Sequence, residues 1–281
     1  MSAAYLKSRK IANSRIVAEL LAARLLGCRR LDIPLKANCV LPENSIAAMR
    51  RGVTRSGTGE PIQYIIAQWD FRGITLKTDK RALIPRPETE ELVQLFLDNC
   101  KDNDSPRVLD FGTGTGCIAI SVAKEKPKAK IMAVDISEDA LNLARENASS
   151  LGVADRISFV NLSDVDLSDV LEPGTIDIII SNPPYIPTAT YETLDRSVKD
   201  FEPREALDGG QDGMDVIRSI IEEAAMLLDS DGRIFLEISA ENNQAPKITQ
   251  FLSEVGFEDA TVHKDALTKE RFISARLASG L

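Results

Sequence analysis

The chain has 281 residues, of which 43% are hydrophobic and 27% charged, and it carries a net charge of −9. These values are ordinary for a globular protein with one large domain and one smaller domain. No stretch has the unbroken apolar run that crosses a bilayer, and the first residues lack the apolar core of a signal peptide, so we expect a cytoplasmic protein with no membrane partner.

Charge is distributed unevenly along the chain. Residues 1–60 contain eleven lysines and arginines against four acidic residues, a balance of +7, whereas residues 61–281 carry −16. A protein that grips duplex nucleic acid normally has its positive field beside its chemistry, so we expect no stable nucleic-acid binding. The basic segment fits a solvated helical face and a partner-docking surface equally well.

The cysteines do not suggest a metal centre. Cys28, Cys39, Cys100 and Cys117 share no CxxC spacing, and His263 is the single histidine. Scattered residues of this kind are typical of reduced thiols, and we expect no metal site.

The N-terminal residues read as short helices. In residues 13–27 apolar pairs recur every four residues, with Asn13 or Ser14 available as a cap and Gly27 as a stop. The stretch "PENSIAAMRRGV" predicts another helix. We therefore expect a small helical domain over residues 1–60.

A polar, glycine-rich stretch over residues 55–61 marks the best candidate for a domain seam. Beyond it, "IQYIIAQWDFRGITLKTD" carries β-branched and aromatic residues on both sides of Arg72-Gly73, which predicts a hairpin. We expect a hairpin linker over residues 61–86 and a catalytic domain over residues 87–281.

In the predicted catalytic domain, helices alternate with short apolar strands. This alternation predicts a doubly wound, mostly parallel α/β sheet, whose ligands bind at the carboxyl ends of the strands. The final two strands are close enough in sequence to pair antiparallel. The expected helices cover residues 91–100, 117–125, 137–152, 214–232 and 248–257, and the expected strands 107–112, 130–135, 157–161, 177–181, 233–239, 260–265 and 271–277.

A glycine-rich loop follows the first of these strands in "VLDFGTGTGCIAI". Its spacing is G-x-G-x-G, whereas the dinucleotide fingerprint is G-x-G-x-x-G, and the chain has no P-loop lysine for phosphoryl transfer. Glycines let a backbone pass close to a ligand, although a tight strand–helix turn is the alternative. The candidate cofactor-binding residues here are Asp110, Gly112, Thr113, Gly114, Thr115 and Gly116.

An acidic residue, Asp135, ends the next strand. A carboxylate there can accept both hydroxyls of a ribose, and capping of the following helix is the alternative. Loop and acid together indicate an adenosine-bearing ligand and resemble the class I S-adenosylmethionine-dependent methyltransferases. That resemblance implies S-adenosyl-L-methionine as cofactor, its methionine and adenosine held by the loop and its ribose by Asp135. Asp164 is then expected near the adenine edge, unless it is a surface acid.

The stretch "DIIISNPPYIP" places Asn-Pro-Pro-Tyr at the end of a strand. The lone pair of a planar NH₂ group is delocalised, so its nitrogen needs two hydrogen-bond acceptors to hold it during methyl transfer. The Asn182 side-chain oxygen and the Pro183 carbonyl can supply them. Pro184 stiffens the backbone, and Tyr185 offers a flat face for stacking. We expect these four residues to bind the substrate and carry catalysis, with Asn182 also at the cofactor.

Several stretches resemble one family in order and spacing, over nearly the whole chain. They are "GEPIQYI" (59–65), "LIPRPETE" (83–90), "DFGTGTG" (110–116), "SNPPYI" (181–186), "EPREALDGGQDG" (202–213) and "KDALTKERFISARL" (264–277). Together they are similar to the HemK/PrmC family of protein-(glutamine-N5) methyltransferases. The chain departs from that pattern at Ala67 and Ser239, where glycine is usual.

The resemblance implies that the substrate is the glutamine of the Gly-Gly-Gln loop of class I peptide chain release factors, docked with help from the basic N-terminus. Arg86 and residues 88–90 would line the entrance, and a plain helix start is the equal alternative. Other substrates stay open at this point: a glutamine on a large-subunit ribosomal protein, or an exocyclic amine of RNA or DNA.

Overall fold

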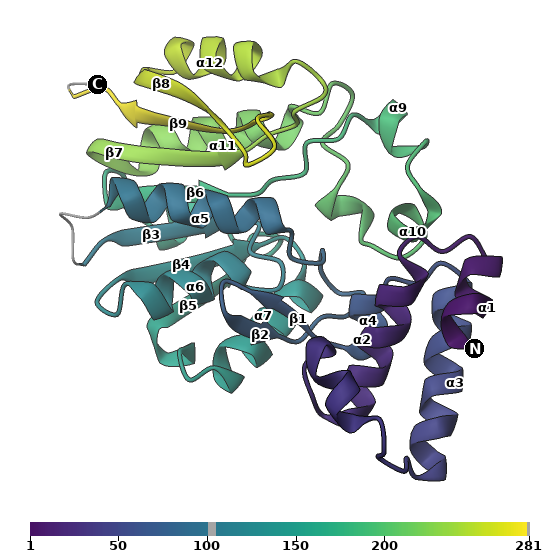
Figure 1. Cartoon of the computed structure of the whole chain (residues 1–281). Coiled ribbons are helices and arrows are strands. Elements are labelled where there is room, and N and C mark those ends of the chain that lie inside the picture. The colour runs from purple at the N-terminus through teal and green to yellow at the C-terminus, as the bar shows by residue number, and fades with distance from the viewer. Residues whose placement is uncertain (101–104, 280–281) are drawn as a thin grey trace.

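The computed structural model describes residues 1–100 and 105–279, so residues 101–104 and 280–281 of the predicted catalytic domain lie outside the described residues. A seven-stranded sheet dominates the molecule (Figure 1), in the order β5-β4-β3-β6-β7-β9-β8. β9 is antiparallel to both of its neighbours and the other pairs are parallel, which confirms the predicted doubly wound sheet with an antiparallel C-terminal strand. The strands are β3 (Arg107–Phe111), β4 (Lys130–Asp135), β5 (Ile157–Asn161), β6 (Ile176–Ser181), β7 (Leu228–Glu237), β8 (Phe257–Lys264) and β9 (Glu270–Leu277).

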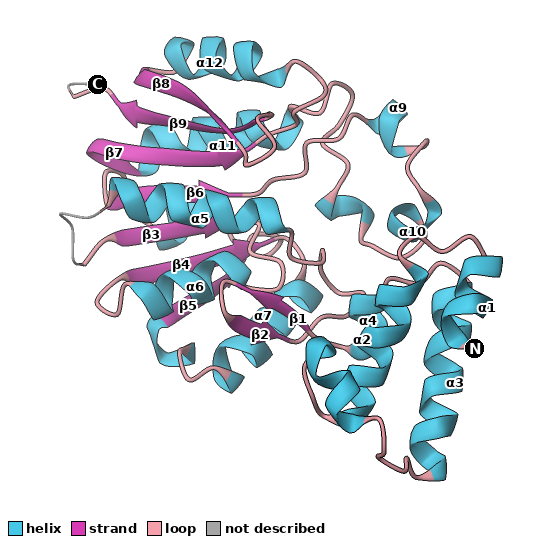
Figure 2. Ribbon diagram, viewed as in Figure 1, coloured by secondary structure: helices cyan, strands magenta, loops and turns pink. Residues whose placement is uncertain are grey.

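Helices cover both faces of this sheet (Figure 2), because its central strands are apolar on both sides. α5, α6 and α7 pack on one face, and α8, α11 and α12 contribute to the core on the other. The helices of this part are α5 (Pro87–Asn99), α6 (Cys117–Glu125), α7 (Glu138–Ser150), α8 (Leu167–Val170), α9 (Thr188–Tyr191), α10 (Arg196–Lys199), α11 (Asp215–Leu227) and α12 (Gln244–Glu254), with 3-10 turns at Ala154–Arg156 and Arg204–Ala206.

The N-terminal residues form the predicted short helices around a small core of their own. Leu6, Leu21, Val53 and Ile66 are its buried members. A Cβ added at Gly52 would lie 2.8 Å from a methyl carbon of Leu21, so this glycine lets two helices approach closely. The helices are α1 (Ser2–Ser8), α2 (Ser14–Leu26), α3 (Glu43–Gly57) and α4 (Ile62–Ile66), with a 3-10 helix over Arg30–Lys36. Among the described residues, no helix has the length and apolar character needed to cross a membrane.

The predicted hairpin is shorter than expected. β1 (Trp69–Phe71) and β2 (Ile74–Leu76) pair around Arg72-Gly73, where both residues have positive φ, as a two-residue hairpin turn requires. Ile62–Ile66, expected to be a strand, is helix α4 instead. Its β-branched residues indicated a strand, but their packing against α2 and α3 favours a helix. The division into domains at residues 60 and 86 stays a prediction.

Further boundaries differ from expectation; α12, for example, begins at Gln244 rather than at residue 248. α5 begins at Pro87 rather than at residue 91, because proline fits the first turn of a helix. The helix expected to run to residue 232 ends at Leu227, and β7 begins at once with the buried Leu228 paired to Ile176.

Of the two positions where the chain departs from the glycine of the resembled family, Ala67 is strained. It ends α4 with φ 55° and ψ 30°, in the left-handed region that disfavours a Cβ. Ser239 has no such strain; its hydroxyl instead accepts the backbone N–H of Glu241 at 3.2 Å.

We expect Ala67→Gly to raise the free energy of unfolding by about 1 kcal/mol, because the left-handed conformation costs about that much for a residue with a Cβ. Urea denaturation followed by circular dichroism measures the change. Ala48→Gly, inside α3, is the matched control and should lower the free energy of unfolding by about 0.5–1 kcal/mol. A loss of stability in Ala67→Gly would contradict the strain at this position.

Candidate active site

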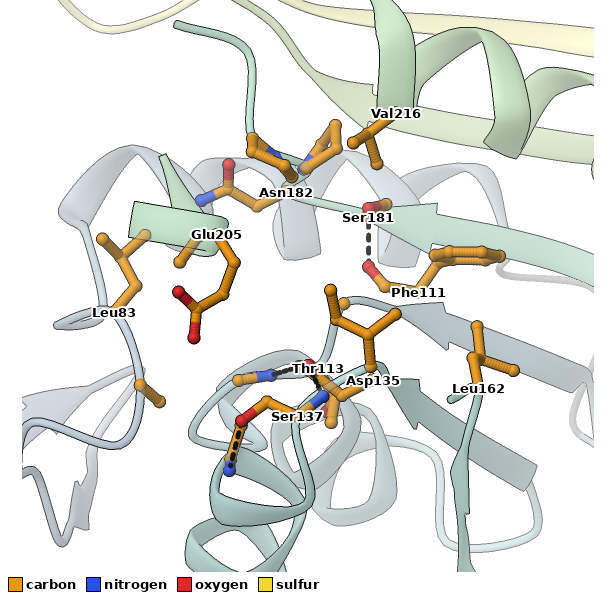
Figure 3. A pocket seen from close by; sticks show the side chains of 18 of the residues that line it. Leu83, Phe111, Thr113, Asp135, Ser137, Leu162, Ser181, Asn182, Glu205 and Val216 are labelled. Atoms are coloured by element: carbon orange, nitrogen blue, oxygen red, sulfur yellow. Dashed lines mark hydrogen bonds between the residues drawn. The ribbon is translucent and has the colours of Figure 1, made fainter. Parts of the chain in front are cut away.

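A cavity opens where three adjacent parallel strands end. Phe111 of β3 lies opposite Val134 of β4 on one side and opposite Ser181 of β6 on the other. The glycine loop, Asp135 and Asn182 therefore leave the sheet at one level, and they line a cavity of about 550 Å³. This volume is within the range of small-molecule sites. Figure 3 shows Asn182 and Asp135 around the same open space.

The glycine loop turns tightly at the end of β3. The backbone N–H groups of Gly112 and Thr113 both donate to one carbonyl of β4, each at 2.9 Å. Gly112 has φ +72°, which a side chain would strain, and a Cβ at Gly116 would lie 3.2 Å from that of Ala144. Gly116 thus brings α6 against α7 and does not itself line the cavity. The loop residues on the wall are Gly112, Thr113, Gly114 and Thr115.

Asp110 supports this loop from inside the protein. Its carboxylate oxygen Oδ2 accepts the Thr113 hydroxyl at 2.7 Å and the Ala119 backbone N–H at 3.1 Å, while Oδ1 is buried without a hydrogen-bond partner among the described residues. Burial raises the pKa of Asp110 to about 7. Asp110 does not line the cavity, so the predicted cofactor contact at this residue stays a prediction.

Asp135 does line the cavity, with part of its carboxylate already engaged. It accepts backbone N–H groups of Gly114 at 2.9 Å and Ser137 at 3.0 Å. Ser137, rather than Asp135, caps α7 through Ala140, which removes the alternative role of Asp135 as the helix cap. A carboxylate offers about four lone-pair directions, so further ones remain for hydroxyls. Burial raises the pKa of Asp135, and the charge of Glu205 raises it further.

Asp164 is the acid that follows β5, the third of the predicted strands. Asp164 is exposed and lies outside the cavity wall, whereas its neighbours Val165 and Asp166 line it. The predicted adenine contact of Asp164 stays a prediction. The end of a strand in the sequence does not predict which of two nearby loop acids, Asp164 or Asp166, lines the cavity.

The backbone of Asn-Pro-Pro-Tyr is fixed by a segment more than twenty residues downstream. Glycines at 209 and 213 lie so close that a Cβ would meet the carbonyl oxygens of Pro184 at 2.6 Å and Tyr185 at 2.4 Å. The Gln244 side chain also donates to the Tyr185 carbonyl at 2.9 Å. These contacts explain the "DGGQDG" part of the sequence, to which no role was assigned.

The polar groups at Asn182 and Pro183 have a defined arrangement. Asn182 donates from Nδ2 to the Thr89 hydroxyl at 3.0 Å, and no described residue donates to its Oδ1. Both residues line the cavity, as does Pro184. Tyr185 does not line it: the ring packs on the apolar core and its hydroxyl donates to Glu237 at 3.2 Å. The predicted stacking role of Tyr185 therefore stays a prediction.

Arg86 lies on the cavity wall and directly precedes α5. Its position therefore fits both alternatives for this segment, the entrance to the site and a plain helix start. Its guanidinium contacts Glu202 at 2.6 Å, and the other oxygen of Glu202 accepts the backbone N–H of Ile84 at 3.1 Å. Glu202 is 5% exposed. This pair fastens the "IPRP" stretch to the segment that precedes the downstream glycines. Of residues 88–90, only Thr89 lines the cavity.

Glu205 and several apolar residues complete the wall. Sequence reasoning assigned no role to Glu205, although it lies in the "EPREALDGGQDG" stretch; its carboxylate points into the open space in Figure 3. Apolar lining comes from several loops and from the first turn of α11. Its members include Leu83, Ile136, Leu162, Val165 and Val216.

Comparison with known proteins agrees with this geometry. A family model described as "Methyltransferase small domain" matches residues 88–199, and one described as "PrmC N-terminal domain" matches residues 1–66. A solved methyltransferase from Pyrococcus furiosus has the same fold, with a TM-score of 0.56 and 18% identity, covering 84% of this chain and 100% of that one.

Several relatives carry the name "Release factor glutamine methyltransferase", among them proteins from Rhodopirellula baltica and Lactococcus lactis. The protein from Rhodopirellula baltica is 37% identical over 271 residues, covering 94% of this chain and 90% of its own length. The protein from Lactococcus lactis is 42% identical over 222 residues, covering 77% of each chain. Fold, glycine loop and strand-end acid thus define an S-adenosylmethionine-dependent methyltransferase. The chain belongs to the release factor glutamine methyltransferase family.

We expect Asp135→Ala to weaken binding of S-adenosylmethionine by about ten- to a hundred-fold, the range for hydrogen bonds to a charged group. Isothermal titration calorimetry measures the dissociation constant. Asp164→Ala in the same titration tests the predicted adenine contact, and unchanged affinity would remove Asp164 from the site. Unchanged affinity of Asp135→Ala would reject the ribose assignment.

Proposed function

We propose that this protein transfers a methyl group from S-adenosylmethionine to the side-chain amide nitrogen of the glutamine in the Gly-Gly-Gln loop of class I peptide chain release factors. Family membership supports the reaction and the substrate. A release-factor substrate also fits the expected cytoplasmic location. The observation that carries the proposal is the Asn182 amide, held at the cavity wall with its donor side engaged and its acceptor side free.

The cavity suits the cofactor in size and in chemistry. Residues 112–115 would lie along its methionine and adenosine portions, and the remaining lone pairs of Asp135 would accept the ribose hydroxyls. When bound, S-adenosylmethionine supplies an electrophilic methyl group on a sulfonium centre.

The protein's own contribution is to hold the glutamine NH₂ group. Asn182 Oδ1 accepts one of its hydrogens and the Pro183 carbonyl oxygen accepts the other, because neither oxygen has a donor among the described residues. Two acceptors on two hydrogens position the nitrogen while its lone pair localises. Such orientation can supply about 7–11 kcal/mol of a reaction barrier.

A histidine base plays no part in this proposal. His263, the single histidine of the chain, lies on β8 with its ring 2.8 Å from the Ser274 hydroxyl, outside the cavity wall. A general base typically raises a reaction rate about 10²–10⁴-fold, which is less than the acceleration that orientation can provide. The amide nitrogen can release its proton after it has received the methyl group.

We expect Asn182→Ala to keep cofactor affinity and lose about 10²–10³-fold in kcat, because one of the two groups that hold the reacting nitrogen is gone. Calorimetry and a tritium-methyl assay on purified release factor separate the two effects. Peptide mass spectrometry of release factor, ribosomal protein and RNA, each incubated with enzyme and cofactor, identifies the acceptor. Near-normal turnover of Asn182→Ala would defeat the acceptor mechanism, and methylation elsewhere than the glutamine would defeat the proposed substrate.

We also infer that the basic N-terminal helices help to dock the release factor. They lie beyond the carboxyl ends of the strands (Figure 1), which is the end of the sheet whose loops line the cavity. The exposed basic residues of these helices and their connecting turns that form no ion pair within the described chain include Lys7, Lys10, Arg50 and Arg51.

Replacing these four residues by glutamine should raise KM for release factor about tenfold and reduce its dependence on salt, because charges at an interface rim steer association. Cofactor affinity should stay constant. The control replaces four exposed lysines of the catalytic domain, Lys124, Lys130, Lys247 and Lys264, which changes the net charge equally. Equal KM values for the two variants would exclude a docking role for the N-terminal helices.

A further inference from the structure

A buried acid, Glu237, lies behind the Asn-Pro-Pro-Tyr segment and outside the cavity wall. It ends β7 and is 1% exposed. Its oxygen Oε2 accepts the Thr89 hydroxyl at 2.7 Å, and Oε1 accepts the Tyr185 hydroxyl at 3.2 Å. Burying a carboxylate is costly even when it is hydrogen-bonded, so this residue calls for a reason beyond packing.

The direction of the hydrogen bonds supplies that reason. An ionised Glu237 has no proton to donate, so the Thr89 hydroxyl must donate to it. The Thr89 oxygen then presents only lone pairs to Asn182, which must approach with its NH₂ group. Consequently the side-chain carbonyl oxygen of Asn182 is the atom left for the substrate.

The opposite orientation of Asn182 would be unproductive. A rotated amide would present N–H donors to the donor NH₂ group of the glutamine, and the two groups would repel each other. The orientation of the Asn182 amide therefore decides whether an acceptor or a donor faces the reacting nitrogen.

We propose that Glu237 is a positioning residue, which acts through the Thr89 hydroxyl to fix the orientation of the Asn182 amide, and through the Tyr185 hydroxyl to hold the end of the same segment. This inference rests on the proposed glutamine methylation. It adds a requirement that Glu237 be ionised, because a protonated or amide side chain at this position can donate to Thr89 and release its hydroxyl toward Asn182.

The surroundings of Glu237 set the pH at which this requirement matters. Burial raises the pKa of Glu237 to about 7, opposed by the hydrogen bonds from Thr89 and Tyr185 and by the Arg271 charge on β9, and assisted by Glu88 on α5. Cys117 on α6 also faces this charge, and burial raises the pKa of its thiol to about 12, so it stays neutral near pH 7. Ionisation of Glu237, and with it kcat, should rise with pH through about 7.

The test measures methylation of release factor by wild type, Glu237→Gln, Thr89→Val and Thr89→Ser between pH 6 and 8.5. We expect kcat of Glu237→Gln and Thr89→Val to fall about ten- to a hundred-fold, the range for a hydrogen bond to a charged group. Thr89→Ser, which keeps the hydroxyl, should retain kcat. The acid limb of the wild-type profile should vanish in Glu237→Gln, while calorimetry gives the wild-type affinity for S-adenosylmethionine.

Thr78→Val is the matched control, because Thr78 is fully buried and donates to the Gln63 carbonyl at 3.0 Å outside the cavity wall. It should lose stability but not kcat. Normal kcat in Glu237→Gln or in Thr89→Val would overturn the inference, as would equal losses in Thr89→Ser and Thr89→Val. If Glu237→Gln does not fold, the comparison of kcat between Thr89→Ser and Thr89→Val still tests the inference. Absence of glutamine methylation by the wild type would instead reject the proposed function.

Discussion

The parallel register of β3 between β4 and β6 is the constraint on which the site depends. Because Phe111 lies opposite both Val134 and Ser181, the next residues of three strands emerge side by side. A shift of either neighbour by one residue would exchange the faces of its strand and move Asp135 or Asn182 away from the glycine loop. The apolar side chains on both faces make such a shift costly, so burial in the sheet also fixes the geometry of the cavity.

Above the sheet, two kinds of restraint act on the same tetrapeptide. Close contacts from the downstream glycines and the Gln244 side chain hold its backbone. Hydrogen bonds that Asn182 and Tyr185 donate to α5 and β7 hold its side chains. The first kind holds the carbonyl groups of Pro184 and Tyr185, and the second holds the Asn182 amide. The tetrapeptide that carries the proposed acceptor pair is therefore held by segments that lie far apart in the sequence.

Local patterns predicted the parts of this structure that depend on local rules. Strand–helix alternation, together with the tendency of ligands to bind at strand ends, placed the glycine loop, Asp135 and Asn182 at one edge of a doubly wound sheet. The same rules could not predict that Tyr185 turns into the core or that Thr89 meets Asn182, because such contacts join residues far apart in sequence. Helix α4 was mistaken for a strand because its packing against α2 and α3 outweighs the preference of its β-branched residues.

The two close glycines also bear on how this protein tolerates inherited variation. Gly209 and Gly213 leave no room for a methyl group beside the backbone of Pro184 and Tyr185. Neither residue is on the cavity wall. Alleles that replace either glycine would thus yield full-length chains with every reacting group present and the tetrapeptide displaced. A survey restricted to residues in contact with ligands would pass over such alleles as harmless.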